Sequence, residues 1–87
     1  MDEFFEILVR ILDYNLRKEN IWYGKLKEKY GNIYPNLSKN IDQAFDLGML
    51  EATYEQIDGM WTRCLKISDD IYPLIYTIYN KNKERIL

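Results

Sequence analysis

The sequence contains no histidine and a single cysteine, Cys64, and these two shortages exclude several kinds of site. Without histidine, the chain lacks the commonest general base and metal ligand, which excludes Ser-His and Cys-His nucleophilic catalysis and a zinc cluster. A lone cysteine forms no disulfide within the chain. We interpret Cys64 as a structural strand residue, and a redox role is the alternative interpretation.

Glycine and long apolar runs are also scarce. The four glycines are too scattered to form a phosphate-binding loop: Gly24, Gly31, Gly48 and Gly59. No apolar run approaches the roughly 18 residues that span a bilayer, and the N-terminus is acidic where a signal peptide is basic. We therefore expect a cytoplasmic protein with no membrane segment.

Two pairs of neighbouring carboxylates remain as candidates for acid–base chemistry, Asp2-Glu3 and Asp69-Asp70. Each pair lies at a predicted helix start, where negative side chains complement the helix dipole. We interpret both pairs as helix-start residues. The sequence thus predicts no catalytic residue, no metal site and no cofactor, and we expect that the protein is not an enzyme.

A helix followed by a hairpin is the clearest pattern that is present. Apolar residues recur at helical spacing over residues 36–47, and Gly48 follows them, where a left-handed helix end needs no Cβ. The apolar residues of this predicted helix are Leu37, Ile41, Ala44 and Phe45. Apolar and polar residues then alternate over residues 50–67 around Asp58-Gly59, a dipeptide that favours a type I′ turn.

The two-residue turn sets the register of the hairpin, because it pairs Ile57 with Met60 and Leu50 with Ile67. One face then carries Leu50, Ala52, Leu65 and Ile67, with Tyr54 and Trp61 further out. The other face carries Glu51, Thr53, Glu55, Thr62, Cys64 and Lys66.

The remaining elements follow from apolar periodicity and capping residues. We predict a helix over residues 3–18, a short strand over 20–22, a helix over 24–30 and a last helix over 69–83. The whole chain, residues 1–87, is then a single domain of the α+β class that is mainly α.

The first and last helices carry more apolar and tyrosine surface than one small core uses. We therefore expect a homodimer joined through these two helices, because aromatic rings with polar tips suit interfaces. The predicted interface residues are Phe5, Val9, Tyr72, Tyr76 and Tyr79. The alternatives are a fully internal first helix and tyrosines that only flank one buried face.

Over residues 20–72 the chain resembles winged helix-turn-helix transcription regulators, most of all the small PadR-like and MarR-like repressors of archaea and bacteria. In that family the recognition helix ends in a pattern like Leu-x-x-Leu-Gly-Leu-Ile before a two-stranded wing. The corresponding residues here are Ile41, Phe45, Leu47, Gly48, Met49 and Leu50. The family's wing leads into a Ser- or Thr-capped helix, and Leu-Lys-Ile-Ser-Asp-Asp at residues 65–70 is similar.

The resemblance implies that double-stranded DNA is the partner and that the third helix enters the major groove. With Leu37, Ile41 and Ala44 toward the core, the predicted DNA-binding residues of this helix are Asn36, Ser38, Lys39, Asn40 and Gln43. Asn and Gln can grip adenine, and Ser and Lys can hold phosphate. We also predict DNA contacts at Arg63, near the hairpin tip, and at Lys25, Lys27 and Lys29 of the second helix.

The charge distribution argues against DNA. The formal net charge is −2, and residues 40–62 contain five acids and no base, which would repel a phosphate backbone. Two hypotheses therefore stand: a dimeric DNA-binding transcriptional regulator, and a protein–protein interaction module whose acidic wing faces a basic protein partner. Cations of the second helix on one continuous face with Lys39 and Arg63 would favour DNA, and an acidic wing face would favour a protein.

Overall fold

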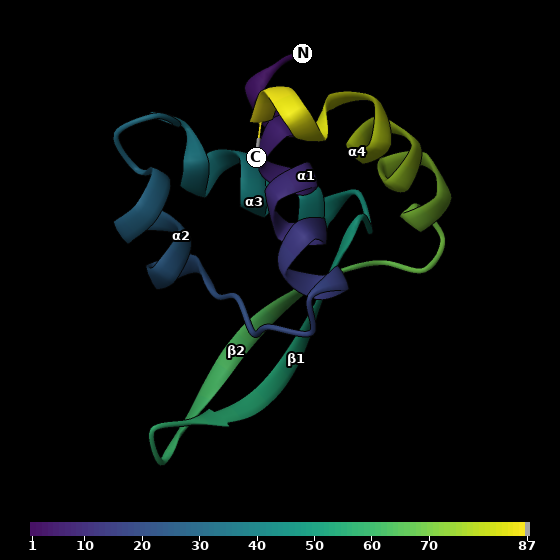
Figure 1. Cartoon of the computed structure of the whole chain (residues 1–87). Helices are drawn as coiled ribbons and strands as arrows, with labels where there is room; N and C mark the ends of the chain where they lie inside the picture. The colour runs from purple at the N-terminus through teal and green to yellow at the C-terminus, as the bar shows by residue number, and fades with distance from the viewer. Residues whose placement is uncertain (87) are drawn as a thin grey trace.

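The computed structural model describes residues 1–86, which form four helices and one two-stranded antiparallel sheet (Figure 1). The elements, in chain order, are α1 Glu3–Leu16, α2 Tyr23–Tyr30, α3 Leu37–Asp46, β1 Leu50–Ile57, β2 Met60–Ile67 and α4 Tyr72–Ile86. This arrangement confirms the predicted α+β class with mainly helical content. Across the described chain, the helices are all too short or too polar to cross a membrane.

Helix α1 forms the centre of the core and packs against α3, β2 and α4. Asp2 caps it, because an Asp2 carboxylate oxygen accepts a hydrogen bond from the Phe5 N–H at 3.0 Å. Its buried residues are Ile7, Leu8, Val9, Ile11, Leu12 and Tyr14. The chain itself therefore covers most of the apolar surface that suggested a second subunit. The prediction that Val9 lies at a dimer interface is wrong, because Val9 is 0% exposed in the isolated chain, whereas Phe5 is half-buried.

The segment between α1 and α2 corrects two predictions. Helix α1 ends at Leu16 rather than at residue 18, because Lys18 adopts the left-handed conformation with φ +58°. The predicted strand over residues 20–22 is absent. A single backbone hydrogen bond joins this segment to β2, from the Leu65 N–H to the Ile21 carbonyl at 2.8 Å, and the Ile21 side chain anchors the segment in the core.

The hairpin has the predicted register throughout, from the Leu50–Ile67 pair to the Ile57–Met60 pair. Both turn residues have positive φ, +51° at Asp58 and +81° at Gly59, as a type I′ turn requires. Cys64 is buried, although we predicted it on the polar face, because residues 18–21 lie over that face and line a pocket with Thr53 and Cys64.

Helix α4 begins at Tyr72, three residues later than predicted. Backbone bonds from the Ile71 N–H to the Ser68 carbonyl and from the Tyr72 N–H to the Asp69 carbonyl form a turn before it. The helix has Pro73 in its first turn, as expected, and continues to Ile86. The boundaries of α2 and α3 differ from the predicted ones by a single residue at each changed end.

Candidate functional site

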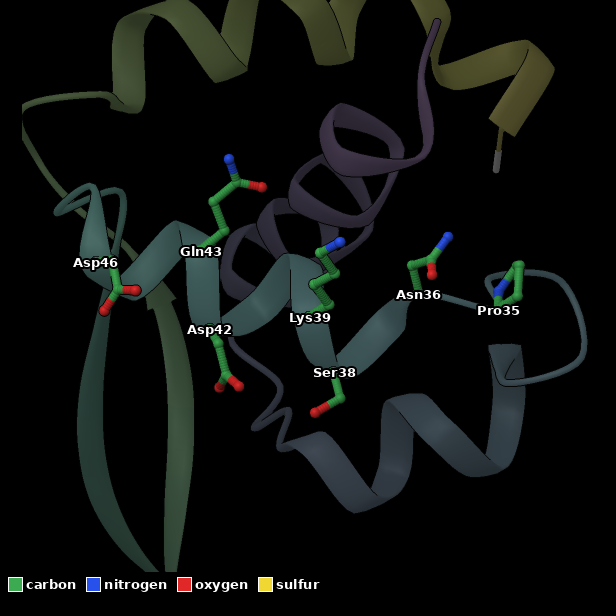
Figure 2. A pocket seen from close by; sticks show the side chains of 7 residues that line it. All are labelled: Pro35, Asn36, Ser38, Lys39, Asp42, Gln43 and Asp46. Carbon is green, nitrogen blue, oxygen red and sulfur yellow. The ribbon is translucent and has the colours of Figure 1, made fainter.

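The exposed side of α3 carries the main candidate site. Leu37, Ile41 and Ala44 are buried, so the predicted core side of this helix is confirmed. Figure 2 shows the opposite side, where a shallow depression is lined by Pro35, Asn36, Ser38, Lys39, Asp42, Gln43 and Asp46. Ser38, Lys39 and Gln43 are exposed there as predicted, but two aspartates lie among them.

The N-terminal end of α3 is attached to α1 through Glu3. One Glu3 carboxylate oxygen accepts hydrogen bonds from the Asn36 backbone N–H and from the Asn40 side-chain amide, each at 2.9 Å. Asn40 is half-buried, and its amide nitrogen already donates to Glu3. The structure therefore does not place Asn40 outward with Ser38 and Lys39, as the sequence had suggested.

A second polar network also positions α3, and the sequence analysis did not find it. The Arg10 Nε donates to the Tyr34 hydroxyl at 2.6 Å, and this hydroxyl donates to a Glu6 carboxylate oxygen at 3.0 Å. Burial raises the pKa of Tyr34, against the opposing effect of Arg10. Glu3, Glu6 and Arg10 recur at helical spacing in the sequence. This polar side of α1 is the pattern from which the network could have been predicted.

A groove of about 350 Å³ connects α3 with the beginning of α2 and with β2. Its lining residues are Trp22, Tyr23, Gly24, Ser38, Ile41, Asp42, Thr62, Arg63 and Leu65. No side chain caps α2, for which Trp22 is the N-cap residue. An uncapped helix start offers free backbone N–H groups to an anion, and Ser38 and Arg63 add a hydroxyl and a positive charge. Asp42 lines the same groove and opposes an anion.

Arg63 lies midway along the hairpin, opposite Tyr54, rather than near its tip as predicted. Its guanidinium carbon lies 4.2 Å from the centroid of the Phe45 ring, so the C-terminal part of α3 holds it in place. This contact brings Arg63 next to α3.

The lysines of α2 do not join this face. The Lys25 and Lys29 Nζ atoms lie 5.2 and 5.5 Å from the centroid of the Tyr14 ring, which belongs to α1. Lys27 is exposed on a different side of α2, because a helix turns by about 200° over two residues. The continuous cationic face with Lys39 and Arg63 that would have favoured DNA over a protein partner is therefore not formed.

The outer half of the hairpin, residues 54–61, has a different character. It contains two acids, Glu55 and Asp58, and no base. It also presents large apolar side chains to solvent, with Tyr54 63%, Met60 72% and Trp61 72% exposed. Isolated exposed apolar residues are common, but three on one short hairpin mark a candidate contact surface.

The three predicted interface tyrosines of α4 form a stack along one side of this helix. The ring centroids of Tyr72 and Tyr76 are 5.7 Å apart, and those of Tyr76 and Tyr79 are 6.1 Å apart. The Tyr79 hydroxyl donates to an Asp13 carboxylate at 3.2 Å, which attaches the stack to α1. Tyr76 is 39% exposed and is the member that a second molecule can reach.

Comparison of the chain with protein-family models, with curated proteins and with solved structures gives no match. Over residues 1–86, no three acidic or cysteine side chains gather as metal ligands. The candidate site therefore consists of the α3 face, the groove beside it and Arg63.

Proposed function

We propose that the chain is a winged helix-turn-helix regulator that binds double-stranded DNA with α3 as its recognition helix and with the hairpin as its wing. The order of the elements supports this proposal, since a helix pair is followed directly by a two-stranded antiparallel hairpin and then by a last helix. In Figure 1 the hairpin projects from the helical body, as a wing does.

The observation that carries the proposal is the groove shared by α2, α3 and β2. It gathers the uncapped start of α2, the Ser38 hydroxyl and the Arg63 guanidinium. All three are groups that hold phosphate oxygens in protein–DNA complexes. Beside the groove, the exposed Lys39 and Gln43 are free to contact phosphate and base edges.

The charges predict how such binding behaves. Residues 37–67 carry five acids and three bases, so non-specific attraction to DNA is weak. Lys39 and Arg63 are the cations of this face, and each phosphate neutralised contributes about 0.9 to the slope of log affinity against log salt. We expect a slope of roughly −2 per chain by the same rule. Most of the free energy of binding must then come from specific contacts.

Selection from a random duplex library at low salt, followed by gel shifts at two salt concentrations, tests the proposal. Lys39→Ala should reduce the salt slope by about 1, and Gln43→Ala should relax base preference at a cost of about 1–3 kcal/mol. Lys81→Ala removes an equal charge from the exposed surface of α4 and serves as the control. Failure of the wild-type chain to retain any duplex at low salt would exclude the proposal.

We further propose that the regulator is a homodimer joined through α4. The tyrosine stack supports this part, because Tyr76 is exposed between two half-buried rings and tyrosine is enriched at interfaces. A twofold dimer would present two copies of α3 to two half-sites of one duplex.

A protein-interaction module is the second candidate, and the outer half of the hairpin favours it. This region has two acids and no base, and its exposed tyrosine and tryptophan suit cationic side chains of a protein partner. A Trp22→Phe variant leaves Trp61 as the fluorescent reporter. Saturable binding of a Lys- and Arg-rich peptide that weakens in Glu55→Gln/Asp58→Asn, with no duplex retained at low salt, would support the module over the DNA regulator.

A further inference from the structure

Three cations converge on the aromatic ring of Tyr14, a residue of α1. The Arg17 guanidinium carbon lies 4.6 Å from the centroid of the Tyr14 ring, and the Lys25 and Lys29 Nζ atoms lie 5.2 and 5.5 Å from it. We call these three residues and Tyr14 the Tyr14 cluster. Each contact between a cation and the ring face is weakly attractive, whereas the like charges of Lys25 and Lys29, four residues apart on α2, oppose one another.

The carboxylates near the cluster neutralise only part of its charge. Arg17 pairs with Asp13 and Glu19, each at 3.0 Å. The ion pairs found among residues 1–86 involve neither Lys25 nor Lys29. The two lysines, four residues apart on α2, therefore bring two uncompensated positive charges together above the same ring.

The Tyr14 phenol responds to this surplus. Burial raises the pKa of Tyr14, but hydrogen bonding with Lys29 and Tyr30 and the charges of Lys29 and Lys25 outweigh burial, so the pKa lies below its ordinary value. A surrounding that favours a negative charge on the phenol oxygen favours a bound anion for the same reason.

The Tyr14 cluster is separate from the α3 face. Figure 2 places α1 on the far side of α3 from the labelled side chains, and the buried side of α3 packs against α1. The cluster shares no residue with the α3 face, although the Lys25 Nζ lies 5.3 Å from the ring of Trp22, which lines the groove beside α3.

We propose that Lys25 and Lys29 form an anion-binding site whose ligand is a phosphoryl group that bridges the two lysine ammonium groups above Tyr14. Lysine holds phosphate as a point charge, whereas the nitrogen atoms of the Arg17 guanidinium already face Asp13 and Glu19, so the two lysines carry the site. The phosphoryl group comes either from a small phosphate compound or from a nucleic-acid backbone. The inference does not depend on DNA binding by α3.

Titration of the protein with inorganic phosphate at constant ionic strength tests the site. The tyrosine ring resonances, assigned with a Tyr14→Phe variant, and the fluorescence of Trp22 in a Trp61→Phe background report binding, because the Lys25 Nζ lies 5.3 Å from the Trp22 ring. The test variant is Lys25→Ala/Lys29→Ala, and Lys27→Ala removes a charge from a different side of the same helix as the matched control.

We expect saturable phosphate binding by the wild-type chain and by Lys27→Ala, weakened at least tenfold in the double variant. Equal binding by all three proteins, or no saturable binding by the wild type, would overturn the proposal.

A parallel titration with a random-sequence duplex identifies the source of the phosphoryl group. Because the double variant removes two charges and Lys27→Ala one, a loss of log duplex affinity more than twice that of Lys27→Ala indicates a nucleic-acid backbone, and loss of phosphate binding alone indicates a small phosphate compound. Lys39→Ala should leave phosphate binding unchanged, which separates this test from that of the α3 face.

Discussion

Helices α1 and α4 are almost equal in length, with 14 and 15 residues, yet the chain buries them very differently. Helix α1 has six buried residues, and α4 has one, Ile75. Both helices are rich in apolar residues. The difference arises because α1 has neighbours on several sides, whereas α4 covers α1 from outside.

This comparison separates residues that maintain the fold from residues that are free to bind. Side chains of α1 hold α3, β2 and α4 through packing and through hydrogen bonds of Glu3, Glu6 and Asn15. Side chains of α4 make fewer such contacts, and Leu74 and Tyr76, the exposed member of the tyrosine stack, remain accessible. Mutations in α1 should therefore change stability, and mutations on the outside of α4 should change association.

Truncation of Leu12 should give the largest effect. Leu12 is fully buried in α1, so Leu12→Ala should lower the free energy of unfolding by about 2–5 kcal/mol through lost burial and a cavity. The matched control is Leu74→Ala on α4, where the side chain is 49% exposed and the loss should stay within about 0.5 kcal/mol. Urea denaturation of both variants measures the difference, and equal losses would contradict the contrast between the helices.

Asn15 should give the next largest effect, because it joins α1 to β2 through two hydrogen bonds. Its amide donates to the Leu65 carbonyl at 3.1 Å, and its side-chain oxygen accepts from the Ile67 N–H at 2.9 Å. Asn15→Ala should destabilise the fold by about 2 kcal/mol, since it leaves backbone groups of β2 without partners. Asn80→Ala, at an exposed position of α4, is the control. Urea midpoints that do not differ between the two variants would argue against this role of Asn15.

The elements that the sequence predicted well depend on local patterns. The helix over α3 and the register of the hairpin follow from periodicity and from the Asp58-Gly59 turn, and both lie within one short stretch of chain. The burial of Val9 and Cys64 depends instead on segments that are distant in sequence or that fold over a face after it forms. A single sequence shows that a residue is apolar but does not show which segment covers it.

The candidate site also contains residues that local patterns placed correctly and residues that they did not. Helical spacing placed Ser38, Lys39 and Gln43 outward, and the structure agrees. Asn40 differs because Glu3, 37 residues earlier, accepts its amide hydrogen. Lys25 and Lys29 differ because Tyr14 of α1 attracts them. The positions of long polar side chains depend on partners in other elements, and no local pattern indicates those partners.

A variant of Tyr76 tests whether the outside of α4 joins two copies of the chain. If α4 joins two chains, Tyr76→Glu should weaken the dimer at least tenfold, equivalent to about 1.4 kcal/mol, by placing a charge in the tyrosine stack. Leu74→Glu is the matched control, because residue 74 lies about 200° around the helix from residue 76. Light scattering over a concentration series should show a dimeric mass for wild type and for Leu74→Glu. A wild-type chain that is monomeric at micromolar concentration would rule out the homodimer.

The hairpin tip lies outside both helices and should give a smaller, purely local effect. Gly59 has φ +81°, and a Cβ added there would have no atom of residues 1–86 within 4 Å beyond its chain neighbours, so strain at a substituted residue comes from the backbone alone. Gly59→Val should destabilise the domain by about 1 kcal/mol, whereas Gly59→Asn should cost less, because asparagine tolerates the left-handed region. Thermal melts compare the two variants, and identical midpoints for valine and asparagine would count against the type I′ turn.

The smallest expected effect concerns alkaline pH and the polar side of α1. Burial is the main factor that raises the pKa of the Tyr34 phenol above its ordinary value of 10.0, with Arg10 opposing it. Below pH 10 the phenol is neutral in both the folded and the unfolded chain, so its contribution to stability is fully present. As pH rises above 10, the unfolded chain loses this proton first, and the contribution is lost as pH passes through the higher folded pKa.

Tyr34→Phe should therefore make the alkaline decline in the free energy of unfolding, measured by urea denaturation, shallower. The difference should be less than about 1.4 kcal/mol per pH unit, which is the limit for one proton. Some decline should remain, because burial also raises the pKa of Tyr30 and Tyr79. Tyr76→Phe, on the exposed side of α4, is the control. If the stability of both variants declined in parallel with that of the wild type between pH 9 and 11, ionisation of Tyr34 would make no contribution to the alkaline loss of stability.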